Sequence, residues 1–203
     1  MNRSRKDGYN PTRNAPAIGM KHKDLIGIPW MLAFALRADG WYLRQDIIWH
    51  KPNPMPESVK DRCTKSHEYI FLLTKSPRYY FDADGISEPA KPDSYVRRRD
   101  ETKPGRTKMK ENTYTRRNKR DVWSITTKPY KGAHFATFPE TLVEPCLIAG
   151  TEKGDTVLDP FFGSGTVGVV AMKFGREFIG CELNPEYIKL AEERLSNVQM
   201  ELR

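Results

Sequence analysis

Residues 157–187 read VLDPFFGSGTVGVVAMKFGREFIGCELNPEY, and this stretch decides the fold of the 203-residue chain. The short apolar run Thr156–Leu158 predicts a buried parallel strand. Gly163–Gly165 predicts a tight turn with room for a ligand beside the backbone. The apolar spacing then predicts a helix over Thr166–Phe174 and a second strand over Glu177–Cys181. The stretch therefore predicts a strand–loop–helix–strand unit.

An acidic residue follows the second predicted strand. Glu182 comes 23 residues after Asp159, and nucleotide-binding units of this kind place an acidic residue about 20 residues on. That carboxylate accepts hydrogen bonds from ribose hydroxyls. The unit therefore predicts a nucleoside cofactor.

The loop itself narrows the choice of cofactor. A dinucleotide site needs spaced glycines and a helix N-terminus free to hold a pyrophosphate. Here a carboxylate, Asp159, and two aromatic rings, Phe161 and Phe162, stand where an anion would need room. This favours a cationic, phosphate-free ligand such as S-adenosylmethionine over a nicotinamide dinucleotide. We expect Asp159 near its positive end and one of the two phenylalanines on its adenine or sulfonium side.

Length and composition set further bounds. A chain of 203 residues is long enough for one substantial core. We expect neither a membrane span nor a signal peptide, because no apolar run is long enough and the first residues are polar and basic. Three widely spaced cysteines, Cys63, Cys146 and Cys181, predict reduced thiols in a cytoplasmic protein. No spacing of His, Cys or Asp predicts a metal site.

The excess positive charge is confined to one segment. Residues 91–120 contain 12 Lys or Arg against 4 Asp or Glu, and this difference equals the net charge of +8 for the whole chain. Such a segment is either a solvated insertion or an arm that binds nucleic-acid phosphates. The candidate DNA-binding residues are Arg97, Arg98, Arg99, Lys108, Lys110, Arg116, Arg117, Lys119 and Arg120.

Further elements are predicted on either side of the basic segment. Upstream, we expect a helix at Ile28–Ala38 and strands at Trp41–Trp49 and His67–Thr74. Downstream, we expect helices at Phe138–Ala149 and Pro185–Leu195, the latter opened by a proline at its first position.

Four further motifs, in this order along the chain, accompany the glycine loop. They are DLIGIPW at 24–30, DIIWHKPNPMP at 46–56, HE at 67–68 and HFATFP at 134–139. With the loop, they closely resemble the amino-group DNA methyltransferases, in the permuted subclass whose cofactor motif lies near the C-terminus. The resemblance covers most of the chain. It implies methyl transfer from S-adenosylmethionine to N6 of adenine or N4 of cytosine in double-stranded DNA.

The resemblance also implies roles for segments and residues. Residues 1–90 would form part of the catalytic half, 91–120 a target-recognition insertion, and 121–203 the cofactor-binding half. The target-base pocket would include Trp49, His50, Lys51 and Pro52, although Trp49 fits a core position equally well. The cofactor residues would be Asp159, Phe161, Gly163, Ser164, Gly165, Thr166, Glu182, Asn184, Phe135 and Thr137.

One family motif is missing. Methyl transfer in this family depends on a (Asp/Ser/Asn)-Pro-Pro-aromatic motif that binds the target amine and stacks on the flipped base. The chain has 15 prolines and no Pro-Pro pair, so we expect no catalytic residue in it. The family's third to fifth strands would also lie upstream. We therefore expect the C-terminal part of a Rossmann-like α/β methyltransferase with an incomplete sheet.

Such a portion would be inactive alone, and an N-terminal fragment or partner protein would have to supply the motif. The main alternative is a non-catalytic subunit or fragment that binds DNA or cofactor. Methylation of RNA or protein fits less well, because the whole order of motifs matches the DNA family.

Overall fold

The computed structural model describes residues 19–90, 95–99, 107–111, 115–127 and 138–201. Within these ranges the helices are α1 (Ile28–Ala38), α2 (Glu140–Gly150), α3 (Thr166–Lys173) and α4 (Pro185–Glu201). The strands are β1 (Tyr42–His50), β2 (His67–Thr74), β3 (Glu88–Pro89), β4 (Tyr95–Arg99), β5 (Thr107–Glu111), β6 (Arg116–Arg117), β7 (Val122–Ser124), β8 (Thr156–Asp159) and β9 (Glu177–Gly180). The helices and strands predicted outside the basic segment are all present. Most of their ends differ from the predicted ends by a few residues.

The first sheet has the strand order β2-β1-β7. β1 pairs with β2 in antiparallel register, Ile47 opposite Ile70, and with β7 in parallel register, Trp49 opposite Trp123. Neighbouring side chains on a strand point to opposite faces. One face therefore carries Trp49 and Ile47, which lie in a core with Leu142 of α2.

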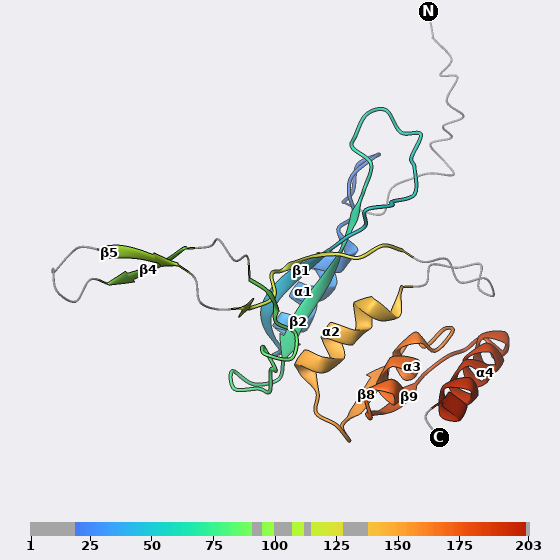
Figure 1. Ribbon diagram of the computed structural model, residues 1–203. Coiled ribbons are helices and arrows are strands. Elements are labelled where there is room, and N and C mark those ends of the chain that lie inside the picture. Colours follow the sequence, from blue (N-terminus) through green and yellow to red (C-terminus); the bar gives the residue numbers. More distant parts are fainter. Residues whose placement is uncertain (1–18, 91–94, 100–106, 112–114, 128–137, 202–203) are drawn as a thin grey trace, which may run out of the picture.

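The opposite face of this sheet is covered by α1. Trp30 packs edge-on against Tyr69 and Phe71 of β2, with ring centroids 5.5 and 5.0 Å apart. Pro29, in the first turn of α1, favours a helix start because its missing N–H has no helical partner to lose. The two helices α1 and α2 thus enclose the first sheet (Figure 1).

The second sheet is the parallel pair β8-β9, joined by α3. Val157 and Phe178, paired in register, pack against a core that contains Val170 of α3 and Leu147 of α2. On the other face, Leu158 is 62% exposed and its partner Ile179 57% exposed. Within the described ranges no further strand joins this pair.

The α/β fold class is confirmed, and α2 connects its two parts. Adjacent residues of this helix belong to different cores: Leu142 packs with the first sheet, and Val143 with α3. Figure 1 shows α2 between the two sheets. The division at 1–90, 91–120 and 121–203 stays a prediction. No helix among the residues described is long and apolar enough to cross a membrane.

The basic segment contains an antiparallel ribbon of β4 and β5, which projects from the body (Figure 1). At its root, the short strands β3 and β6 pair Glu88 with Arg117. Neither strand pair was predicted, since the segment has little apolar periodicity.

Replacing Leu147 by alanine should lower the free energy of unfolding by about 2–4 kcal/mol, because it leaves a cavity in the core beneath α2. Leu147 is 5% exposed, whereas Leu25 is 90% exposed. Leu25→Ala is the matched control and should change stability by less than about 0.5 kcal/mol. Urea unfolding followed by circular dichroism measures both. Equal losses in the two variants would contradict this core assignment.

Candidate functional site

The glycine loop between β8 and α3 requires its two glycines. Gly163 and Gly165 have φ angles of 51° and 77°, in the left-handed region that other residues rarely adopt. Space is also limited, since a Cβ at Gly165 would lie 3.0 Å from the Cβ of Ala191 on α4. Backbone hydrogen bonds from Phe162 N–H to Cys181 O and from Cys181 N–H to Asp159 O fasten the loop to the end of β9.

The two phenylalanines of the loop have different roles. The Phe162 ring stacks on Phe178, with centroids 5.5 Å apart, and fills the space beside Gly168 and Gly180. Its packing is structural, so it is not the ring that contacts a ligand. Phe161 is 87% exposed. Of the two predicted candidates, Phe161 is the exposed one.

Glu182 fixes the shape of the loop from the side of β9. Its Oε2 accepts a hydrogen bond from Gly163 N–H, and its Oε1 accepts from Leu183 N–H and Asn184 N–H, each at 2.8 Å. Hydrogen bonds from the Asn184 and Gly163 amides lower the pKa of Glu182 below its usual value, although partial desolvation raises it. The predicted acidic residue therefore lies beside the glycine loop as an anion.

The other carboxylate of the loop and the asparagine after Glu182 have local hydrogen bonds. Asp159 Oδ1 accepts from Phe161 N–H at 3.0 Å, which turns the chain at the end of β8. Asn184 Oδ1 accepts from Glu186 N–H at 2.9 Å in the first turn of α4. The Asn184 side chain thus caps the start of α4. The sequence analysis had predicted this side chain at the cofactor.

The side chains of Ser164 and Thr166 are buried against α4. Each is 7% exposed, and both hydroxyls accept hydrogen bonds from Arg194 of α4, at 3.0 and 3.3 Å. Their contact with a cofactor stays a prediction. Arg194 was missed by sequence reasoning, because a single arginine on an amphipathic helix carries no distinctive pattern. The predicted Phe135 and Thr137 lie outside the described residues.

The predicted target-base pocket is only partly assembled. Trp49 is 4% exposed and its indole N–H donates to Ile125 O at 2.8 Å, so it is a core residue and not a stacking platform. His50 Nδ1 lies 3.1 Å from Ser124 Oγ. Lys51 forms an ion pair with Glu68, and its ammonium lies 4.4 Å from the centroid of the Trp49 ring.

Lys51 does line a polar cavity of about 380 Å³ beside the proline-rich loop of residues 51–56. Its lining residues are Pro29, Lys51, Glu57, Lys65, His67, Glu68 and Tyr69. Trp49, His50 and Pro52 do not contribute to it. Of the four residues predicted for the target-base pocket, Lys51 lines this cavity, together with Glu68 of the HE motif and Tyr69.

A second cavity, of about 360 Å³, lies between α2 and the first sheet, and no residue of the glycine loop lines it. Cys146 is on its wall, where surrounding protein raises the pKa of the thiol to about 11. The Cys146 residue is exposed, as are Cys63 and Cys181. Among the residues described, no group of three or more His, Cys, Asp or Glu is arranged for a metal ion.

The predicted DNA-binding cations divide into two sets. The first set lies on the projecting ribbon, with Arg97, Arg98 and Arg99 on β4 and Lys108 and Lys110 on β5. In its register, Arg98 is opposite Lys108.

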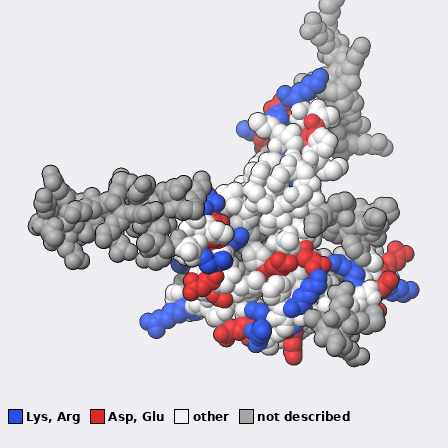
Figure 2. Space-filling model, in the orientation of Figure 1, with Lys and Arg blue, Asp and Glu red and all other residues white. Residues whose placement is uncertain are grey.

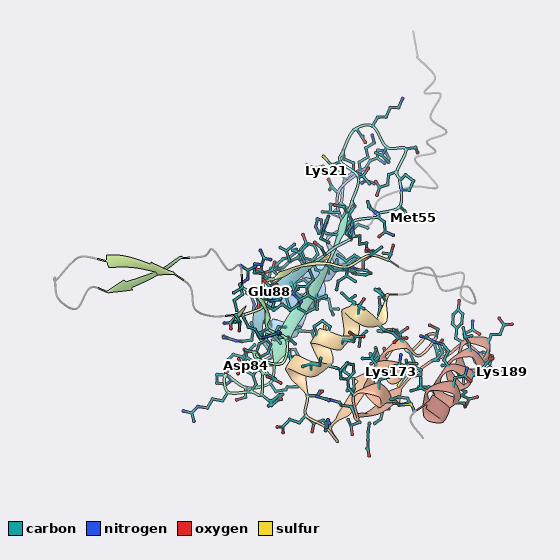
Figure 3. All side chains as sticks on the ribbon, viewed as in Figure 1. Lys21, Met55, Asp84, Glu88, Lys173 and Lys189 are labelled. Atoms are coloured by element: carbon teal, nitrogen blue, oxygen red, sulfur yellow. The ribbon has the colours of Figure 1, made fainter. Side chains whose placement is uncertain are left out.

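The second set lies at the root of the ribbon and has partners within the chain. Glu88 forms ion pairs with Arg117 at 2.9 Å and Arg120 at 2.6 Å (Figure 3). Desolvation raises the pKa of Glu88, but the hydrogen bonds from these arginines outweigh it and lower the pKa overall. Arg116 donates to Ser87, and Lys119 lies 5.1 Å from the Trp123 ring centroid. Figure 2 shows Lys and Arg side chains interspersed with Asp and Glu side chains on the visible face of the molecule.

Comparison with known proteins identifies what this arrangement resembles. A family described as DNA methylase, of the N6/N4 methyltransferases, matches residues 6–193. The type II methyltransferase M.Cfr9I of Citrobacter freundii is 54% identical over 195 residues, which cover 93% of this chain and 58% of that protein. M.SmaI of Serratia marcescens is 50% identical, over 96% of this chain and 59% of that protein. The chain thus spans somewhat more than half the length of these curated relatives.

Solved structures show the same fold. The M1.HpyAVI–SAM complex has a TM-score of 0.58 at 25% identity, over 85% of this chain and 72% of that one. The cytosine-N4-specific PvuII DNA methyltransferase has a TM-score of 0.63 at 19% identity, over 87% and 61%. The predicted Rossmann-like methyltransferase fold is thereby confirmed.

Acidification should release the Gly163 amide from Glu182. Because the folded-state pKa is lowered from the ordinary 4.5, this hydrogen bond is intact above pH 4.5 and is lost as the pH falls through the lower value. The Gly163 amide resonance, followed by NMR from pH 6 down to about 3, should therefore titrate with a midpoint below 4.5. In Glu182→Gln the titration should vanish. A midpoint at or above 4.5 in the wild-type chain would refute the contact.

Proposed function

We propose that this chain, which belongs to the N6/N4 DNA methylase family, is the cofactor-binding and DNA-contacting portion of a site-specific DNA methyltransferase. The methyl group would pass from S-adenosylmethionine to the exocyclic amine of adenine, at N6, or of cytosine, at N4. The observation that carries the proposal is the glycine loop held by Glu182, with a second carboxylate, Asp159, at its start.

The residues of the loop fit S-adenosylmethionine, the cofactor of this family. Residues 159–166 contain an aspartate and no Lys or Arg, which suits a ligand with a positive sulfonium and no phosphate. The exposed ring of Phe161 offers an apolar surface to the adenine. The glycines bring the backbone close to the ligand without a Cβ in between. When bound, S-adenosylmethionine supplies an activated methyl group.

Glu182 can serve the ribose and the loop together. A carboxylate has roughly four positions at which it accepts hydrogen bonds, and three are used by the amides of Gly163, Leu183 and Asn184. One position is left for a ribose hydroxyl while the loop keeps its shape. We therefore assign Glu182 two roles, in loop geometry and in cofactor binding.

DNA binding is assigned to the ribbon of β4 and β5. Its cations belong to the segment that carries the whole net charge of the chain, +8. A two-stranded ribbon is also narrow enough to enter the major groove of DNA. The arginines at its root, Arg117 and Arg120, are already paired with Glu88. We therefore assign them to anchoring the ribbon, and the cations of β4 and β5 to the phosphates.

The chemistry proposed is direct, in-line transfer to an amine of a base turned out of the duplex, without a covalent enzyme intermediate or a metal. The chain lacks a Pro-Pro-aromatic motif to hold that amine and stack on the base. We propose that an upstream segment or a partner protein supplies it.

The second sheet supports a role for such a segment or partner. β8 pairs with β9 on one side, and within the described ranges its other edge has no strand partner. The face that carries Leu158 and Ile179 is largely exposed. An apolar sheet face and an open strand edge favour association with another chain segment.

A second candidate function is binding without catalysis. The missing motif favours it, because a chain with cofactor and DNA sites could act as a subunit or fragment that transfers no methyl group itself. The activity experiment below separates the two candidates.

DNA affinity should depend steeply on salt, and the ribbon should account for much of that dependence. Replacing Arg97, Arg98 and Arg99 by glutamine should reduce the slope of log K against log salt by about 2–3 units, because each phosphate contact contributes roughly one. Fluorescence anisotropy with a duplex of mixed sequence measures the slope. The matched control replaces three exposed cations outside the segment, Lys21, Lys60 and Arg78. A slope that falls equally in both triple variants would contradict the assignment.

The purified chain alone should transfer no methyl group from labelled S-adenosylmethionine to mixed-sequence DNA, because nothing in it orients the target amine. Addition of a second polypeptide that carries a Pro-Pro-aromatic motif, built on the part of M.Cfr9I that this chain does not match, should restore incorporation if the chain is a catalytic portion. A copy of that polypeptide with its Pro-Pro pair replaced by Ala-Ala is the control. Incorporation by the chain alone would overturn the expectation. Binding of DNA and cofactor without restored transfer would favour the non-catalytic candidate.

A further inference from the structure

We propose that Arg194 is a positioning residue for the methyl donor, which holds the glycine loop in its ligand-binding shape from the side opposite Glu182. The inference rests on the cofactor site of the proposed function. Arg194 lies on α4, and its side chain is 16% exposed. It lies outside residues 134–139 and 157–187, the two segments whose motifs predicted the cofactor residues.

Arg194 contacts the loop at its centre. One nitrogen of the guanidinium donates to the Ser164 carbonyl oxygen at 2.7 Å and to the Ser164 hydroxyl at 3.0 Å. It also lies 3.3 Å from the hydroxyl of Thr166, the first residue of α3. Hydrogen bonds from a charged donor are stronger than those between neutral groups. Arg194 therefore fixes both the loop and the start of the following helix.

The position of Ser164 explains why this contact sets the shape of the loop. Ser164 stands between Gly163 and Gly165, two residues with positive φ that impose little conformational preference of their own. Its side chain is buried, and buried polar groups need hydrogen-bond partners. The bonds to Arg194 supply those partners and select one conformation for a flexible sequence.

The loop is thus held between two charged groups. Glu182 accepts from the Gly163 amide on the side of β9. Arg194 donates to the carbonyl oxygen of the following residue, Ser164, on the side of α4. The Gly163–Ser164 peptide lies between these two contacts. Its orientation is therefore fixed by a hydrogen bond to the carboxylate on one side and one from the guanidinium on the other. Glu182 was expected to contact the ligand, whereas Arg194 contacts the loop from α4.

The opposite end of the Arg194 guanidinium connects the loop to α2. Its second terminal nitrogen lies 3.6 Å from Glu140, the first residue of α2. Glu140 also accepts a hydrogen bond from Lys173, the last residue of α3, at 2.8 Å (Figure 3). Only a branched side chain spans both contacts, and a lysine, with its single ammonium, would keep one of them at most.

The test uses the full chain and three variants. Arg194→Met removes the donors but keeps an unbranched apolar stem, and Arg194→Lys keeps one charged donor. Lys189→Met is the matched control, on an exposed position of the same helix (Figure 3). Amide hydrogen exchange of residues 160–168, compared with that of α2 and β8-β9, is measured by mass spectrometry. Calorimetry gives the dissociation constant for S-adenosylmethionine.

In Arg194→Met the loop amides should exchange at least about tenfold faster, and the dissociation constant should rise about tenfold or more, as expected for a lost charge-assisted hydrogen bond. Arg194→Lys should lie between this variant and the wild type, and Lys189→Met should behave as the wild type. Exchange that rises equally in α2 and both strands would mean that Arg194 serves general stability, and would overturn the proposal. Unchanged loop exchange would also overturn it.

Failure of the proposed function would look different. If the wild-type chain binds no S-adenosylmethionine, the cofactor assignment of the chain alone fails. Exchange within residues 160–168 still decides whether Arg194 holds the loop.

Discussion

The packing of α2 against two cores is the constraint on which the arrangement of this chain depends. Leu142 lies with Trp49 and Trp123 on the first sheet, and the next residue, Val143, lies with Val170 of α3. Successive residues on a helix are about 100° apart, so one helix can serve two cores that lie on adjacent sides of it. In the described part of the chain the two sheets share no strand pairing. The position of the glycine loop relative to the ribbon and the polar cavity therefore depends largely on this helix.

Phe162 provides the second constraint, within the cofactor half. Its ring occupies the space left by three glycines, at positions 165, 168 and 180, so that loop, helix α3 and strand β9 close around one side chain. Glycines that look like a ligand motif in the sequence thus have a packing role as well. Among the glycines at 163, 165, 168 and 180, only Gly163 has open space where a Cβ would point, with no atom nearer than 3.9 Å.

The sequence predicted regular elements well where their patterns were local. Helix Ile28–Ala38 and strand His67–Thr74 appear with the expected ends, because proline at the helix start and the apolar run of the strand are strong local signals. The unit from Thr156 to Glu182 was also anticipated. The ribbon of β4 and β5 was not, since its residues are mostly charged and their pairing depends on cross-strand contacts that composition does not reveal.

Individual side chains of the site were harder to predict, because the sequence does not show which face they take. Phe161 and Phe162 are adjacent and chemically identical, yet one is exposed and the other packs on Phe178. Trp49 fitted a pocket or a core, and the hydrogen bond from its indole to Ile125 settles the choice. Ser164 and Thr166 are in the motif, but their hydroxyls contact Arg194, which lies 30 and 28 residues further along the chain. No local sequence pattern indicates such a contact.

These contacts separate the two tasks that methyl transfer demands. The geometry around the cofactor loop is set within this chain, by strands β8 and β9, helices α3 and α4, and the charged groups of Glu182 and Arg194. For a target amine we propose a different source, because the sequence has no Pro-Pro pair and the polar cavity lined by Lys51 has charged walls. Tight positioning of both reactants is what converts binding into rate. We therefore propose that this chain holds the methyl donor and that residues from elsewhere position the target amine.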